Sequence, residues 1–339
     1  MNHPKISIVI PIYNVEPYIA DCLRSVALQT YQGEIECFLI DDCGTDKSME
    51  IAKSFVDSYK GNVIFRILKH AHNRGLSAAR NTGTEQATGD YVYFLDSDDE
   101  MDEHCLEWLT QPLLTGEVYD ILVGGYRVTG TGSATPALHL SDGTMLEGDA
   151  IMRAYVKGEW YVMAWNKLCN LSFLRKYKLT FKEGLLHEDE LWTFQVACRA
   201  NRLRIVNRPC YVYKLREGSI MVNDKAKERR VLTMMGIIED MTDYLLREHL
   251  SSPYAAMLVM EKSYIDVWHE LLYMHTDTDY TTTCCMKCRH QISRLPYLLR
   301  AKVCSLGMKQ AIRYWGALLP TRLFTPYYRM LDHIYKLKK

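Results

Sequence analysis

Two aspartates at alternate positions follow directly on an apolar segment. Residues 91–95 predict a buried strand, and Asp96 and Asp98 come just after it. Carboxylate oxygens in such a place are the ligands that Mg²⁺ and Mn²⁺ prefer, and these ions also bridge phosphates. An acidic turn that caps the next helix would have the same residues, so the pair alone leaves both interpretations open.

The elements that would position this pair alternate between apolar strands and amphipathic helices. Strands are expected at residues 5–11, 37–40, 63–68 and 91–95, and helices at 19–27 and 45–59. Strands joined through helices form right-handed parallel crossovers, and such sheets bind ligands beyond the carboxyl ends of their strands. Three of these ends carry Tyr13, Asp42 and the Asp96/Asp98 pair, so the acidic pair lies where a nucleotide is expected.

Four segments in order carry a resemblance to a known family. They are residues 8–14 (IVIPIYN), 40–46 (IDDCGTD), 73–81 (NRGLSAARN) and 96–99 (DSDD). The set resembles the inverting family 2 glycosyltransferases of the bacterial surface-polysaccharide type. That resemblance implies an α/β protein of GT-A fold, with a Rossmann-like mixed, mostly parallel sheet flanked by helices. It also implies a nucleotide-sugar donor and Mn²⁺ or Mg²⁺ as the cofactor.

The resemblance assigns the base and ribose pocket of the donor to the first two motifs. It implies that Pro11 and Tyr13 line this pocket and that Asp42 accepts a ring N–H of the base, expected to be uracil. These residue types suit the roles, because an aromatic ring stacks on a base and a carboxylate accepts from a ring donor. The family usually has Asp-Asp-Gly-Ser at the second motif, and Cys43 departs from that pattern.

Arginines of the third motif are the cations nearest this pocket in the sequence. Arg74 and Arg80 are expected to contact a phosphate of the donor, as a planar guanidinium suits. For Arg80, a position on a helix surface is the alternative.

The acidic residues of the fourth motif are expected to have different roles. The resemblance implies that Asp98 contacts the metal directly, while Asp96 binds the ribose hydroxyls or reaches the ion through water. Ser97 is placed with the donor-binding residues, and Asp99 is expected to cap the following helix.

A second acidic constellation opens a helix at residues 187–192 (HEDELW). Acidic residues there complement a helix dipole, so capping alone would account for them. The resemblance instead implies that Asp189 is the catalytic base, with Glu188 as its neighbour, and inverting transfer does need a carboxylate to deprotonate the attacking hydroxyl. Zinc is not indicated, because the paired histidine spacing of a zincin is absent.

Two further segments resemble parts of the family that face the acceptor and the diphosphate. Trp165 could stack on a sugar ring or pack in the core. Residues 211–219 resemble a mobile loop that brings Arg216, and with it Ser219, to the diphosphate and excludes water from the bound donor.

Composition is that of an ordinary globular protein of 339 residues. The start of the chain has no secretory pattern and no segment is apolar enough to span a bilayer, so a cytoplasmic location is expected. The 11 cysteines are expected to be free thiols, and Cys285-x-x-Cys288 lacks the second pair of a zinc site.

The C-terminal part of the chain is strongly basic. Residues 281–339 contain 12 Lys or Arg and one acid, Asp332, for a net charge of +11, while the whole chain sums to zero. Mixed with Trp, Tyr and Leu, such a segment is typical of contact with an anionic membrane surface, here the inner face of the plasma membrane. A helical subdomain whose basic face balances the acidic remainder is the alternative. Nucleic acid is not expected, because no nucleic-acid motif accompanies the charge.

These observations divide the chain and define its expected function. Residues 1–222 form the GT-A domain, with a donor-binding half at 1–125 and an acceptor half at 126–222, and residues 223–339 form a helical region, basic from 281. The expected activity is metal-dependent, inverting transfer from a UDP-sugar to a saccharide or lipid-linked oligosaccharide acceptor. A nucleotidyltransferase is the alternative enzyme, although the Gly-rich phosphate loop that it needs is missing near Pro11. A catalytically silent module that binds nucleotide or glycan is the alternative outside catalysis.

Overall fold

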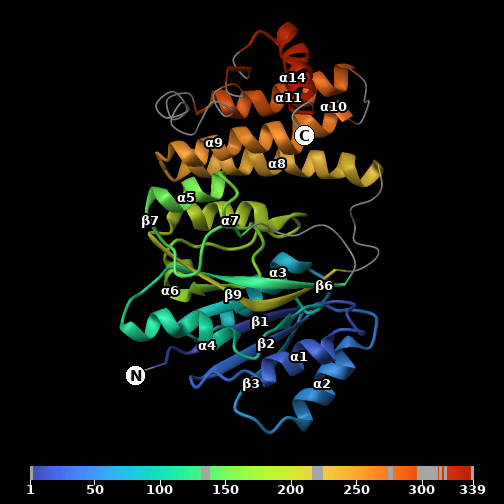
Figure 1. The fold of residues 1–339 in the computed structure, drawn as a ribbon. Helices are drawn as coiled ribbons and strands as arrows, with labels where there is room; N and C mark the ends of the chain where they lie inside the picture. Colours follow the sequence, from blue (N-terminus) through green and yellow to red (C-terminus); the bar gives the residue numbers. More distant parts are fainter. Residues whose placement is uncertain are drawn as a thin grey trace. The chain divides into compact units, whose positions relative to one another are not determined.

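The computed structural model describes residues 3–130, 138–215, 224–273, 278–295, 312, 315–316 and 319–336. The chain divides into two compact units, Met1–Glu217 and Gly218–Lys339. Figure 1 draws the chain as a ribbon and labels most of the helices and many of the strands.

Among the described residues, nine strands form one mixed sheet in the first unit. Eight of them follow the order β3-β2-β1-β4-β8-β6-β9-β5, and β7 pairs with β9. The strands are β1 (Ile6–Ile12), β2 (Ile35–Asp41), β3 (Ile64–Lys69), β4 (Tyr91–Phe94), β5 (Glu100–Met101), β6 (Ile121–Gly130), β7 (Met145–Glu147), β8 (Lys167–Asn170) and β9 (Arg202–Leu215). The helices of this unit are α1 (Ile19–Ala27), α2 (Ser48–Ser58), α3 (Leu76–Gln86), α4 (Cys105–Thr110), the 3₁₀-helix η1 (Gln111–Thr115), α5 (Asp149–Val156), α6 (Leu171–Lys176) and α7 (Glu188–Arg199).

The first four strands confirm the predicted parallel arrangement. β1 pairs in parallel with β2 and with β4, and β2 pairs in parallel with β3. Every residue of β1 and β2 is buried, as expected for strands covered on both faces. In β3, which lies at an edge of the sheet, every residue is exposed or partly exposed. Helices α1 and α2 lie side by side, and α3 packs on β1 (Figure 1). Antiparallel pairing begins at β8, which joins β4 to β6.

Two glycines fix how closely α3 approaches the sheet. Gly75, just before the helix, has φ +84°, a conformation that other residues rarely adopt. A Cβ at Gly83 would lie 2.4 Å from Cγ1 of Val9 on β1. Helix α3 therefore rests with its backbone on the strand, and this contact sets the position of Arg80 one turn earlier.

The second unit is helical. Its helices are α8 (Asp224–Arg247), α9 (Pro253–Lys262), the π-helix η2 (Ser263–His269), α10 (Glu270–Tyr273), α11 (Thr278–Ser293) and α14 (Thr321–Lys336). This agrees with the helical C-terminal region that the sequence analysis expects. Met234 and Met241 of α8 are buried, in keeping with a packing role for the methionines. No helix among the described residues is long and apolar enough to cross a membrane.

We expect Gly83→Ala to lower the free energy of unfolding by about 1–3 kcal/mol, because the added methyl group overpacks the contact with Val9. Gly236 of α8 is the matched control, since a Cβ added there would meet no atom within 4 Å. At that position the same substitution should stabilise by up to about 1 kcal/mol through helix propensity. Urea unfolding followed by circular dichroism measures both, and equal effects would contradict the close approach of α3 to β1.

Candidate active site

Three strand ends converge at one edge of the sheet, as the sequence predicted. Because β1 pairs in parallel with both β2 and β4, the loops that follow these strands share that edge. Pro11 lies buried within β1, and Tyr13 beyond its end is 48% exposed. The roles predicted for these two residues at a nucleotide base stay predictions.

The loops after β1 and β2 are tied to one another. Asn14 Oδ1 accepts from the backbone N–H of Thr45 at 2.8 Å, and Ser48 Oγ accepts from the N–H of Val15 at 2.8 Å. Asn14 and Cys43 both have positive φ, 53° and 59°. These side-chain hydrogen bonds therefore fix the backbone conformation of the two loops that follow β1 and β2.

The Asp42 carboxylate is 2% exposed and organises the loop that precedes α3. Its Oδ1 accepts from His70 Nδ1 at 2.7 Å and from the N–H of Arg74 at 2.8 Å. Its Oδ2 accepts from the N–H of Gly75 at 2.8 Å. Each carboxylate oxygen has two lone pairs, so these three donors leave one lone pair of Oδ2. The predicted acceptance of a base N–H by Asp42 stays a prediction. Sequence reasoning missed His70, whose position one residue beyond β3 was the available signal.

The two arginines of the third motif have different surroundings. The guanidinium of Arg74 donates to Glu183 at 2.8 Å, between two partly exposed side chains. Arg80 is 1% exposed, so the alternative of a helix-surface position is wrong for it. A phosphate contact by either arginine stays a prediction.

The Arg80 guanidinium joins the two acidic constellations that the sequence analysis identified separately. Its Nη2 donates to Asp96 at 2.8 Å. Its Nη1 donates to Glu188 at 2.6 Å and to Asp189 at 3.0 Å. A planar cation with several donors suits this arrangement, and the Phe181 ring lies 5.2 Å from its central carbon. Asp96, one of the two residues predicted for the metal, and the predicted base with its neighbour are therefore held around one buried charge.

These contacts and burial shift the pKa values of Arg80 and Asp189. Burial alone would lower the pKa of Arg80, but the carboxylates of Asp189, Asp96 and Glu188 raise it well above its ordinary value. The Asp189 side chain is 19% exposed. Burial raises the pKa of Asp189 to about 7, against the opposing effect of Arg80. A carboxyl group with a pKa near neutrality is suited to accept a proton from a substrate.

Helix α7 presents this pair at its first turn. Glu188 and Asp189 are its first two residues, and the residue before them, His187, has φ +60° and makes no side-chain cap. Both carboxylates reach Arg80, so they have partners beyond the helix end. Capping alone therefore does not account for them.

The fourth motif forms the acidic cluster after β4. One carboxylate oxygen from each of Asp96, Asp98 and Asp99 lies within 4.8 Å of the others, the one such group among the described residues. Oxygen donors in this number fit a hard divalent cation. Asp96 and Asp98 are partly exposed, while Ser97 is buried. The role of Ser97 in donor binding stays a prediction.

The prediction that Asp99 caps the next helix is wrong. Its Oδ2 accepts from the Tyr211 hydroxyl at 2.7 Å and its Oδ1 from the N–H of Lys214 at 2.8 Å, both on β9. His104 is the residue before α4. Burial, with the neighbouring Asp96, raises the pKa of Asp99 to about 7. Asp99 therefore ties the acidic loop to β9 across the sheet.

Comparison with known proteins identifies the family of this chain. The sequence profile of glycosyl transferase family 2 matches residues 7–177. The chain belongs to glycosyl transferase family 2. Two relatives are the glycosyltransferase GlyA of Streptococcus pneumoniae, 32% identical over 226 residues, and the uncharacterized glycosyltransferase YibD of Escherichia coli, 32% identical over 221. Each match covers 64% of this chain, but only 31% of GlyA and 63% of YibD.

A solved structure is similar in fold to nearly the whole chain. Residues 1–349 of Staphylococcus aureus TarS, in complex with UDP-GlcNAc, superpose with a TM-score of 0.72 at 20% identity. The match covers 99% of this chain and 92% of that structure. This family 2 chain therefore has the GT-A fold that the sequence motifs implied.

Aromatic side chains of the family 2 chain pack behind the acidic cluster. Trp165 is buried, and its ring stacks on Tyr211 with centroids 4.5 Å apart and on Tyr213 at 5.3 Å. The core-packing alternative is therefore confirmed for Trp165. Lys167 is also buried, donating to the Met163 carbonyl, and burial lowers its pKa to about 7. Sequence reasoning considered Trp165 but missed this cation two residues later.

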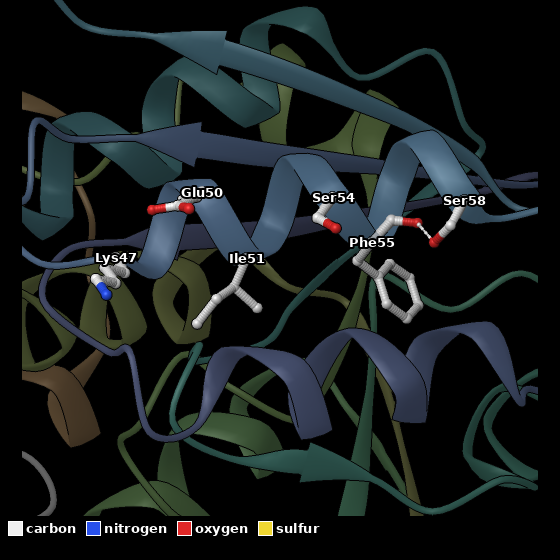
Figure 2. Close-up of a pocket in the computed structure, with 6 residues that line it drawn as sticks. All are labelled: Lys47, Glu50, Ile51, Ser54, Phe55 and Ser58. Atoms are coloured by element: carbon white, nitrogen blue, oxygen red, sulfur yellow. Dashed lines mark hydrogen bonds between the residues drawn. The ribbon is translucent and has the colours of Figure 1, made fainter.

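Two predicted residues are not described by the structure, and two hollows have no residue of the acidic site in their linings. Arg216 and Ser219 fall outside the described residues. A hollow of about 400 Å³ lies at α2, with no residue of the acidic site in its lining. Figure 2 shows the lining residues, which are Lys47, Glu50, Ile51, Ser54, Phe55 and Ser58. A larger hollow of about 790 Å³ lies between α8 and α11 in the second unit. Cys285 and Cys288 are free thiols.

Replacing Arg80 by Met should lower the free energy of unfolding by about 3–5 kcal/mol at neutral pH, because three carboxylates lose their buried partner. The deficit should shrink in mildly acidic buffer, where those carboxylates take up protons. Arg24→Met is the control, since its ion pair with Asp21 is exposed and should cost less than about 1 kcal/mol. Urea unfolding at both pH values measures the difference, and similar losses for the two variants would contradict the central role of Arg80.

Proposed function

We propose that this protein transfers a sugar from a nucleotide-sugar, a UDP-sugar, to an acceptor hydroxyl with inversion of the anomeric carbon. The observation that carries the proposal is the contact of Arg80 with Asp96 on one side and Asp189 on the other. It holds a base beside a donor site built on strand ends. The solved TarS structure with UDP-GlcNAc supports a uridine nucleotide, because it shares the fold of this chain.

The donor would lie over the edge formed by β1, β2 and β4. Tyr13, the most exposed of the predicted pocket residues, would stack on the base, and Asp42 would accept its ring N–H. Asp98 and Asp96 would hold Mn²⁺ or Mg²⁺, which neutralises charge on the leaving diphosphate when bound.

Asp189 would then act on the acceptor. Its carboxylate takes the proton of the acceptor hydroxyl as that oxygen bonds to the anomeric carbon. The bond from that carbon to the diphosphate oxygen breaks on the opposite face, and UDP leaves with the electron pair. Attack and departure on opposite faces invert the anomeric centre.

For the acceptor we propose a saccharide carried on a lipid, as in assembly of a surface polysaccharide. The net charge of +11 over residues 281–339 supports a place at an anionic membrane surface, with the protein peripheral on its inner face. A water-soluble saccharide acceptor would leave that charge without a role in the reaction.

Asp189→Asn should reduce the transfer rate by about 10²–10⁴-fold while UDP binding stays largely intact, because the amide cannot accept the proton. Since the pKa of Asp189 is raised to about 7, transfer by the unaltered protein should fall as pH drops through that value. Asp149→Asn, an exposed acid in the first turn of α5, is the control. Product formation from UDP-sugars measures the rate, and unchanged transfer by Asp189→Asn would favour a silent binding module instead.

Asp98→Ala should weaken Mn²⁺-dependent binding of UDP by about tenfold or more, because the cation loses a carboxylate ligand. Binding in the presence of a chelator should be the same for the variant and the unaltered protein. Asp57→Ala, at an exposed position of α2, is the control. Isothermal titration calorimetry with and without Mn²⁺ tests this, and undiminished Mn²⁺-assisted binding would refute the assigned metal ligand.

A further inference from the structure

Helix α14 presents a row of apolar side chains to solvent. Leu323, Met330 and Ile334 are 47%, 51% and 41% exposed. Their spacing places them within about 40° of one line along an α-helix. We refer to these three side chains as the apolar row.

The apolar row is not the face that holds α14 in its own unit. That face carries Tyr328 and Leu331, both buried. The Tyr328 ring lies 5.2 Å from the ring of Tyr264 and 4.8 Å from that of Trp268, between centroids. Helix α14 therefore already has its packing partners, and the apolar row is additional to them.

Polar and charged residues adjoin the apolar row. Arg329 and His333 are exposed, and each immediately precedes a residue of the row in sequence. On a helix this places them along one flank of the row. An exposed apolar stripe with a cation, here Arg329, and a polar residue on its flank is typical of helices that lie in the interface of a membrane.

An exposed tryptophan lies close by. Trp315 is 62% exposed. Its neighbour Gly316 packs on α14 so closely that a Cβ there would lie 2.2 Å from the Tyr327 ring, and the Tyr327 hydroxyl donates to the Ile312 carbonyl at 2.8 Å. Tryptophan is a residue that favours the boundary between lipid and water.

We infer that the apolar row of α14 inserts into the surface of an anionic lipid bilayer, with Arg329 at the headgroups. The inference rests on the proposed action at a membrane-borne acceptor and identifies the surface that makes the contact. The net charge of +11 over residues 281–339 complements anionic headgroups. A second copy of the chain fits less well, because a two-fold contact through α14 would bring the same cations together.

The test uses the full chain and vesicles of phosphatidylcholine with or without phosphatidylglycerol. The unaltered protein should cosediment with the anionic vesicles, less so as salt is added, and not with the neutral ones. Replacing the row together, Leu323→Gln, Met330→Gln and Ile334→Gln, should weaken this binding by at least about tenfold through lost apolar burial. These side chains are exposed, so the variant should keep its circular dichroism spectrum.

A matched control removes three comparably exposed apolar side chains from the first unit. Leu28→Gln, Ile64→Gln and Val118→Gln together should leave vesicle binding unchanged. Equal binding by the row variant and the unaltered protein would overturn the inference. So would a dimer of the unaltered protein that becomes monomeric in the row variant by sedimentation velocity, since a second copy would then cover the row.

Failure of this inference can be told apart from failure of the proposed function. Hydrolysis of UDP-sugars without vesicles or acceptor should be the same for the row variant and the unaltered protein. Hydrolysis with no vesicle binding would refute the membrane surface alone. Vesicle binding through the row with no action on any nucleotide-sugar would refute the transferase proposal alone.

Discussion

One buried guanidinium holds the acidic site of this protein together. Arg80 contacts Asp96, which follows β4, and two carboxylates at the start of α7, which are more than 90 residues further along the chain. Three carboxylates this close would repel one another, and burial would increase that repulsion. Their shared cation makes the arrangement compatible with a folded protein and leaves Asp189 with a pKa about 7. The chemistry proposed for the site depends on this balance.

Backbone contacts at both ends of α3 fix the position of the Arg80 guanidinium. Gly75, the residue just before helix α3, donates its N–H to Asp42, and the helix rests on β1 at Gly83. The helix is thereby fixed to two neighbouring strands at once, and Arg80 lies between these two anchoring points. On the other side, Asp99 joins the acidic loop to β9 through Tyr211, whose ring stacks on the buried Trp165. Small residues and aromatic packing therefore determine where the charges meet.

Much of this arrangement could be predicted from the sequence, because it depends on local patterns. Strands such as β1 and β2 are predominantly apolar segments, and the ordered motifs implied both the family and its fold. Contacts between distant residues could not be predicted in the same way. Nothing near Asp99 indicates that Tyr211 lies opposite it, so helix capping was the natural but wrong interpretation. The Arg80 contacts and the His70–Asp42 pair likewise appear only when distant elements meet.

The hydrogen bonds to Asp42 have a consequence for recognition at the strand ends. Three donors of the chain already fix this carboxylate in one orientation. The conformational entropy of its side chain and of the loop at Arg74 and Gly75 is therefore lost during folding and not during association. A molecule that meets such a preorganised acceptor gains the contact without the cost of ordering it. For the proposed nucleotide donor, affinity would then depend on how well its base N–H matches the single remaining lone pair of Oδ2.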